Sequence, residues 1–193
     1  MGSNGIQTFG PSFETIWGLT MANKPKSFET ERLVIMPTSI HDAKFIHRLM
    51  NTPKWIKFIG DRNVHSVSKA KEYIEDKMIP QQKKLGFSNY TIVKKNGGDK
   101  IGTCGLFDRA GLDGLDIGFA LLPEFEGKGF AFEATKRIFD AAFHEFGITK
   151  LSAITTKDNR GSQKLLEKLG LRNKGTTMLP HTTEELLLYE IKK

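Results

Sequence analysis

The sequence of 193 residues is poor in cysteine, has no long hydrophobic run and scatters its five histidines. Its single cysteine, Cys104, excludes an intramolecular disulfide and a cysteine-rich zinc site, and agrees with a reducing compartment. No apolar run approaches the ~18–20 residues of a membrane-spanning helix. The histidines show no spacing typical of metal ligands, so we expect no metal. We expect a cytoplasmic protein with no membrane partner.

The composition is that of one globular domain, with 38% hydrophobic and 26% charged residues. The sequence carries 29 Lys and Arg against 22 Asp and Glu, a formal charge of +7. Such a surplus attracts polyanions, including nucleic acids and phosphorylated cofactors. The basic residues are scattered, however, and a solvated basic surface explains them equally. We therefore expect no DNA partner.

Residues 1–26 differ from the rest, because glycine, serine, asparagine and proline separate a few isolated aromatic residues. The pattern does not resemble a secretory signal. Met21 stands just before the regular pattern begins. We predict an N-terminal extension over 1–26, either flexible or an annotation artefact, with an arm that packs Phe13 and Trp17 on the domain as the alternative. The predicted domain covers 27–193.

Within this domain, strand and helix patterns alternate. Ser39 is a candidate N-cap for the first helix, Gly147 a stop for the third, and Asp158 or Asn159 a cap for the fourth. We predict that the second helix ends near Pro80, since proline breaks a helix interior. The predicted strands are 32–36, 87–93, 100–107, 115–122, 151–155, 171–177 and 185–191, and the predicted helices begin near 39, 68, 130 and 159.

A glycine loop, Glu126-Gly127-Lys128-Gly129, joins a strand to a helix that begins at Phe130. The N-terminus of a helix offers unpaired N–H groups and partial positive charge, which suit a phosphate. The spacing fits neither a P-loop, which needs Ser or Thr after Gly-Lys, nor a dinucleotide fingerprint, which needs a third glycine at position 132. The structural alternative is a glycine turn without a ligand.

Two motifs that flank this loop favour a ligand-binding role over a simple turn. Upstream stands Asp116-Ile117-Gly118-Phe119-Ala120-Leu121-Leu122-Pro123, and downstream Asn159-Arg160-Gly161-Ser162. Together they resemble the GNAT superfamily of acyl-CoA-dependent N-acetyltransferases, and are most similar to the ribosomal-protein N-terminal (alanine/serine) acetyltransferase branch. The resemblance, which includes Thr30-Glu31-Arg32-Leu33 and Gly60-Asp61-Arg62, implies an α/β (α+β) fold. Its sheet is mixed, mostly antiparallel, of about six to seven strands, and flanked by helices.

The resemblance also implies acetyl-CoA as cosubstrate and assigns residues to it. The strand around Phe119, Ala120 and Leu121 is expected to pair with the pantetheine arm and the oxyanion. Asn159 would contact the pantetheine arm, cap its helix, or do both. The residues that would hold the pyrophosphate are Glu126, Gly127, Lys128, Gly129, Phe130 and Ala131.

Three residues depart from the family pattern. Glu124 stands where many members have Gln or Arg, Leu166 where many have a tyrosine that protonates the leaving thiolate, and Leu171 where Phe is common. With that tyrosine absent, Ser162 is the candidate group for the thiolate. The alternative is a hydroxyl that satisfies a backbone group in the first turn of a helix.

Asp116 is the candidate general base, because it matches a carboxylate often found at that position in the family. A surface carboxylate at a strand end is the alternative. Asp61 and Arg62 fall in a connection that the family uses for substrate, with a loop ion pair as the alternative. Cys104 has no histidine partner and reads as a buried thiol rather than a nucleophile.

These residues predict an N-acetyltransferase that moves an acetyl group from acetyl-CoA to a primary amine by direct attack in a ternary complex. The acceptor would be a small molecule or a protein N-terminus, and the enzyme a monomer or homodimer. Glu124 and Leu166 motivate an alternative, a non-catalytic acyl-CoA-binding regulatory module. A further alternative, an RNA- or ribosome-associated protein, is supported by the +7 charge alone.

Overall fold

The computed structural model describes residues 25–180 and 182–193, so almost all of the predicted N-terminal extension lies outside the described residues. The described strands are β1 (Phe28–Glu29), β2 (Leu33–Pro37), β3 (Asn89–Lys94), β4 (Lys100–Asp108), β5 (Leu115–Leu121), β6 (Lys150–Thr155), β7 (Arg172–Thr177) and β8 (Leu186–Lys192). They form one sheet in the order β1-β2-β3-β4-β5-β6-β8-β7. Only the β5–β6 pair is parallel.

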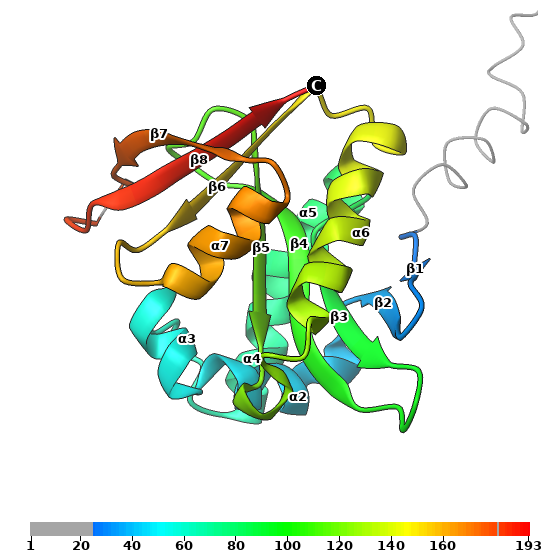
Figure 1. Cartoon of the computed structure of the whole chain (residues 1–193). Coiled ribbons are helices and arrows are strands. Elements are labelled where there is room, and N and C mark those ends of the chain that lie inside the picture. The colour runs from blue at the N-terminus through cyan, green and yellow to red at the C-terminus, as the bar shows by residue number, and fades with distance from the viewer. Residues whose placement is uncertain (1–24, 181) are drawn as a thin grey trace, which may run out of the picture.

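The helices divide between the two faces of the sheet (Figure 1). They are α2 (Ala43–Met50), α3 (Pro53–Phe58), α4 (Val67–Tyr73), α5 (Ile79–Leu85), α6 (Phe130–His144) and α7 (Arg160–Lys168), with short turns η1 (Ile40–Asp42), η2 (Ile74–Met78) and η3 (Pro123–Phe125). Helices α6 and α7 pack on one face, where both contribute to the main core. Helix α5 lies on the opposite face, behind the sheet in Figure 1.

The predicted fold class is confirmed, with eight strands in place of six to seven. The additional strand is β1, which is only two residues long and pairs antiparallel with β2. A run this short carries no alternation that a sequence pattern could reveal. Within the described residues, no helix is both long and apolar enough to cross a bilayer.

The prediction that the second helix ends near Pro80 is wrong. After α4, the chain continues through the wider π-helical turn η2 and then through α5 to Leu85. Pro80 lies at the start of α5, where a missing N–H costs least. The proline therefore begins a new helical segment rather than ending the helical region.

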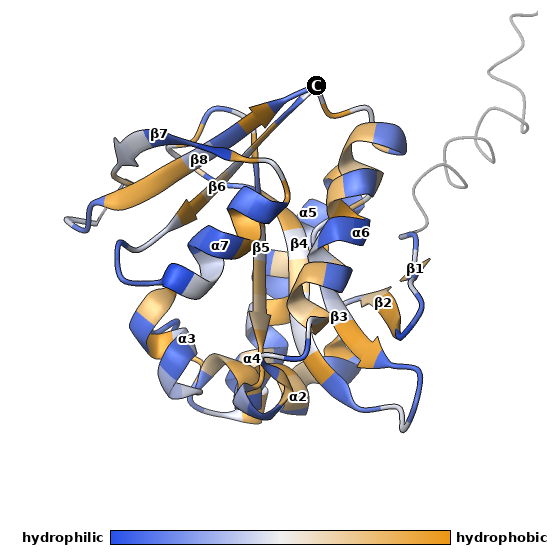
Figure 2. Ribbon diagram, viewed as in Figure 1, coloured by the Kyte–Doolittle hydropathy of each residue, from blue (hydrophilic) through white to orange (hydrophobic). Residues whose placement is uncertain are grey.

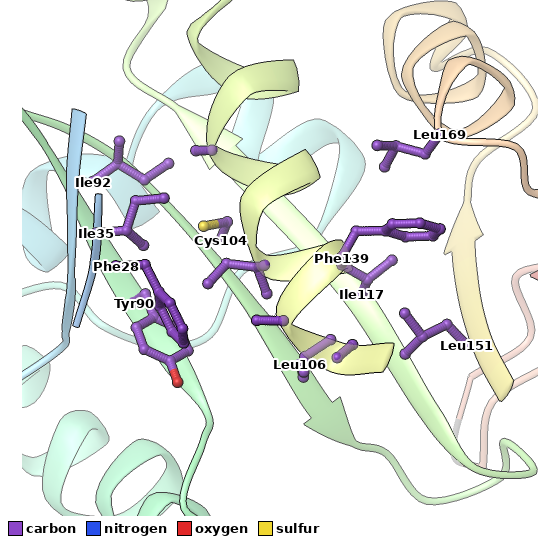
Figure 3. Close-up of a cluster of buried hydrophobic side chains, with 14 of the residues drawn as sticks. Phe28, Ile35, Tyr90, Ile92, Cys104, Leu106, Ile117, Phe139, Leu151 and Leu169 are labelled. Atoms are coloured by element: carbon purple, nitrogen blue, oxygen red, sulfur yellow. The ribbon is translucent and has the colours of Figure 1, made fainter. Parts of the chain in front are cut away.

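The main core fills the space between the sheet and helices α6 and α7 (Figure 3). Ile117 of β5 and Leu151 of β6 lie near Phe139 of α6 there. Figure 2 shows hydrophobic and hydrophilic residues in turn along both helices, as expected for amphipathic helices that cover a core. Cys104 is buried in this core, and burial raises the pKa of its thiol, so the predicted buried thiol is confirmed.

Two glycines let β3, β4 and β5 pack closely. Gly105 of β4 lies opposite Gly118 of β5, and the ring of Phe107 lies against both. A Cβ atom at Gly105 would stand 2.3 Å from the carbonyl oxygen of Ser88. Backbone on the neighbouring strand therefore leaves no room for a side chain at this position.

We predict that Gly105→Ala lowers the free energy of unfolding by about 2–3 kcal/mol, because a methyl group there must displace backbone. The measurement is urea denaturation of both proteins. Gly161→Ala in α7 is the matched control, since its Cβ would meet only the Asn159 carboxamide oxygen, at 3.8 Å, and alanine favours helix. Equal stability of the two variants would contradict the packing argument.

Candidate active site

The sheet separates between β5 and β6. Strand β5 pairs with β4 along its whole length, but with β6 only at Leu115 and Asp116. Figure 1 shows the two strands diverging from there. Beyond Asp116, the edge of β5 that faces β6 therefore has no β-sheet pairing with β6.

The direction of the free backbone groups follows from the pairing with β4. The N–H of Leu122 donates to the carbonyl of Ile101 at 2.8 Å. Backbone groups alternate in direction along a strand, so Ala120 also faces β4, whereas Phe119 and Leu121 direct their N–H and C=O toward the open side. Two of the three residues predicted to pair with pantetheine are therefore oriented for it, and Ala120 can contribute only its side chain.

The predicted phosphate loop follows β5 directly. Gly127 and Gly129 adopt left-handed backbone, with φ of +72° and +81°, which side chains disfavour. Within the described part of the chain, no hydrogen bond uses the N–H of Gly127, Lys128 or Gly129. Since Glu133 makes the first helical bond, to the Gly129 carbonyl, the N–H groups of Phe130 and Ala131 are also unpaired. The structure thus brings these five predicted residues together as successive free donors.

Two carboxylates of this loop turn away from the free amides. Glu124 forms an ion pair with Arg48 of α2, and Glu126 forms one with Lys54 of α3. The Lys128 ammonium donates to the Glu124 carbonyl at 2.8 Å, and so remains beside the loop. Glu126 therefore lies in the predicted phosphate loop, but its carboxylate is paired with Lys54 of α3.

The second half of the predicted site begins after β6. Asn159 caps α7, with its side-chain oxygen accepting from the N–H of Ser162 at 3.1 Å. The capping role predicted for Asn159 is confirmed. Ser162 is partly buried, and within the described residues its hydrogen bond is that of the backbone N–H, which leaves the hydroxyl available. Since α6 and α7 each follow one of the two diverging strands, their N-termini flank the same opening.

Asp116 lies at the closed end of the opening. Its carboxylate is buried and accepts two hydrogen bonds from the Arg109 guanidinium, at 3.0 and 3.2 Å. Burial raises the pKa of Asp116, and the nearby Arg109 charge opposes that shift. At about 3.3 Å per residue, Phe119 lies roughly 10 Å further along the strand. Asp116 is therefore not brought together with Phe119 and Leu121.

Asp61 and Arg62 lie in the exposed loop between α3 and α4. Asp61 accepts from the N–H of Asn63 at 2.7 Å and lies 3.2 Å from the His65 ring nitrogen. Asn63 has a left-handed φ of +56°. Asp61 thus organises a turn, and its carboxylate contacts the His65 ring rather than Arg62.

Helix α3, which the sequence analysis missed, lies across the opening. Lys54 pairs with Glu126 on the β5 side, and Lys57 lies 2.9 Å from Asp158 on the β6 side. Thr52 caps the helix and Pro53 begins it, which is a recognisable helix-start signal. Arg32 and Glu133, to which the sequence assigned no role of their own, form an ion pair beside the phosphate loop.

Comparison with known proteins identifies the family. Residues 32–172 match the model of the acetyltransferase (GNAT) domain. An uncharacterised N-acetyltransferase of Bacillus licheniformis, p20, is 30% identical over 149 residues, covering 76% of this chain and 82% of that protein.

Solved structures show the same fold. The ribosomal-protein-S5-alanine acetyltransferase of Vibrio fischeri superposes with a TM-score of 0.72 at 20% identity, covering 86% of this chain and 96% of that one. A ribosomal L7/L12 alpha-N-protein acetyltransferase in complex with coenzyme A gives 0.73 at 14% identity, covering 86% and 98%. The resemblance drawn from the sequence is confirmed, and the chain belongs to the GNAT family of acetyltransferases.

Proposed function

We propose that this enzyme transfers the acetyl group of acetyl-CoA to a primary amine by direct attack, with both substrates bound together. The observation that carries the proposal is the run of free N–H groups from Gly127 to Ala131, next to a strand whose open side is unpaired. In this arrangement the loop amides and Lys128 hold the diphosphate. Phe119 and Leu121 pair with the pantetheine arm and the oxyanion.

The reaction needs no covalent intermediate on the protein. The amine nitrogen forms the new C–N bond, the C–S bond breaks, and the sulfur leaves as a thiolate that takes up a proton. A thiol pKa of ~8.5 makes this a good leaving group, so one hydrogen bond from Ser162 suffices. Cys104, the only cysteine, is buried with a raised pKa and offers no nucleophile.

The acceptor is proposed to enter from the side of α3 and the loop that carries Asp61 and Arg62. A lysine-like amine is neutral in less than about a thousandth of molecules at pH 7, whereas an α-amino group is neutral in roughly a tenth. The Asp116 carboxylate already accepts two hydrogen bonds from the Arg109 guanidinium. The positive charge of Arg109 makes the carboxylate harder to protonate, which limits its strength as a base. An α-amino group, as at a protein N-terminus, is therefore the acceptor class that this site supports best.

Asp116 remains the proposed acceptor of the amine proton. Its distance along β5 from Phe119 requires at least one water molecule between the carboxylate and the amine.

An amine panel tests the function itself. We expect thiol release from acetyl-CoA with peptides that begin with Ser, Ala or Thr, and slower release with a polyamine at pH 7, because fewer polyamine nitrogens are neutral. Peptides blocked by N-terminal acetylation serve as the control. Binding of coenzyme A without turnover of any amine would instead support a regulatory acyl-CoA-binding module.

The phosphate loop is tested by Gly127→Val. We expect the Kd for coenzyme A to rise about a hundredfold, since a side chain at φ of +72° forces the loop to shift and removes two charge-assisted hydrogen bonds. Isothermal titration measures it. Gly98→Val is the matched control, because Gly98 has φ of +70° and open space around it, but lies in the hairpin between β3 and β4. Unchanged affinity in Gly127→Val would remove the phosphate role.

The base assignment is tested by Asp116→Asn. If Asp116 receives the proton, Asp116→Asn lowers kcat/KM most above the pKa of the carboxylate, where the wild-type group is ionised and can accept it. The inflection that this titration gives the acid limb disappears with the substitution. Asp113→Asn, which removes an exposed carboxylate from the loop before β5, should leave the profile unchanged. An unaltered profile together with lower stability in Asp116→Asn would assign Asp116 to the Arg109 pair alone.

A further inference from the structure

Arg32, in the turn between β1 and β2, reaches the phosphate loop although it is distant in sequence. Its Nη1 donates to the carbonyl oxygen of Lys128 at 3.1 Å. The guanidinium lies 4.5 Å from the centre of the Phe130 ring, and its Nη2 is 3.3 Å from where a Cβ on Gly129 would stand. One side chain therefore contacts the residues on both sides of Gly129, Lys128 and Phe130, and occupies the space beside Gly129 itself.

The bond to the Lys128 carbonyl has a consequence for the next amide. The peptide between Lys128 and Gly129 is planar and trans, so its C=O and N–H point in opposite directions. With the carbonyl held by Arg32, the Gly129 N–H must face away from Arg32. Glycine makes such a peptide easy to rotate, since Gly129 carries no Cβ that would resist the rotation.

Arg32 is itself held in place. Glu133 of α6 accepts from Arg32 Nε at 2.6 Å and from its backbone N–H at 2.9 Å, and also from the Thr30 hydroxyl at 2.6 Å. Burial alone would raise the pKa of Glu133, but these hydrogen bonds from Thr30 and Arg32 together lower it. Glu133 is therefore ionised at neutral pH and fixes the guanidinium between α6 and the loop.

We propose that Arg32, anchored by Glu133, is a positioning residue that keeps the Lys128–Gly129 peptide turned so that the Gly129 N–H faces the cosubstrate's diphosphate. The inference rests on the proposed role of residues 127–131. Arg32 would thus act by orienting the Lys128–Gly129 peptide, and not by attracting the anionic cosubstrate with its own charge.

Substitutions at Arg32 separate geometry from charge. Arg32→Lys keeps the charge but loses the planar fork that reaches Glu133 and the Lys128 carbonyl together, and Arg32→Met loses both. We expect each variant to raise the Kd for coenzyme A about tenfold, as for loss of one amide contact, with kcat changed less than twofold. Glu133→Gln should move the Kd in the same direction. It keeps the test informative if Arg32→Met fails to fold.

A truncated cosubstrate separates positioning from general support of the fold. S-acetylpantetheine lacks the diphosphate, so its kcat/KM in the Arg32 variants should stay within twofold of wild type. Arg137→Met is the matched control. Arg137 also pairs with a glutamate, Glu145, and also lies over an aromatic ring, that of Phe28, but it does not contact the loop.

The outcomes distinguish the two proposals. Wild-type affinity for coenzyme A in Arg32→Lys, or an equal loss with both cosubstrates, overturns the positioning role alone. If wild-type enzyme binds coenzyme A no better than pantetheine, the diphosphate role of the loop fails, and the positioning role fails with it. A tenfold loss confined to acetyl-CoA and coenzyme A, absent in Arg137→Met, supports Arg32 as a positioning residue.

Discussion

The structure depends on one interruption of backbone pairing. Strands β5 and β6 share ladder contacts only at Leu115 and Asp116, and then diverge. Residues 118–121 of β5 are only partly buried, so water or a ligand can satisfy the unpaired backbone groups of this edge. The divergence therefore leaves room beside β5, together with unpaired backbone groups with which an extended ligand can pair. The two helices that follow these strands, α6 and α7, begin at the same opening, where α6 adds its own unpaired N–H groups.

Charged residues connect the layers around this opening. Helix α3 pairs through Lys54 with the loop after β5 and through Lys57 with the loop after β6. Exposed ion pairs of this kind contribute little to stability, about 0–1 kcal/mol each. Their importance lies in geometry, because a single short helix contacts both walls.

Local signals in the sequence predicted most of the fold. The periodic apolar residues of 130–142 and the glycine stop at Gly147 were enough to predict α6. The phosphate loop was predictable because Gly127 and Gly129 stand between a strand and a helix. At Pro80 the same kind of reasoning failed, since a π-helical turn before it allows helix to continue. Strand β1 was too short to show a pattern.

The contacts of the site were harder to predict, because they depend on register and on distant partners. Only the hydrogen bond from Leu122 to Ile101 reveals that Ala120 faces β4 while Phe119 and Leu121 face the opening. Asp116 is bound by Arg109 across the β4–β5 connection. Arg32 and Glu133 are 101 residues apart. The burial of Cys104 has a practical consequence: its thiol is shielded from alkylating reagents while the core is closed. The rate at which Cys104 is labelled under native conditions therefore reports how often α6 separates from the sheet.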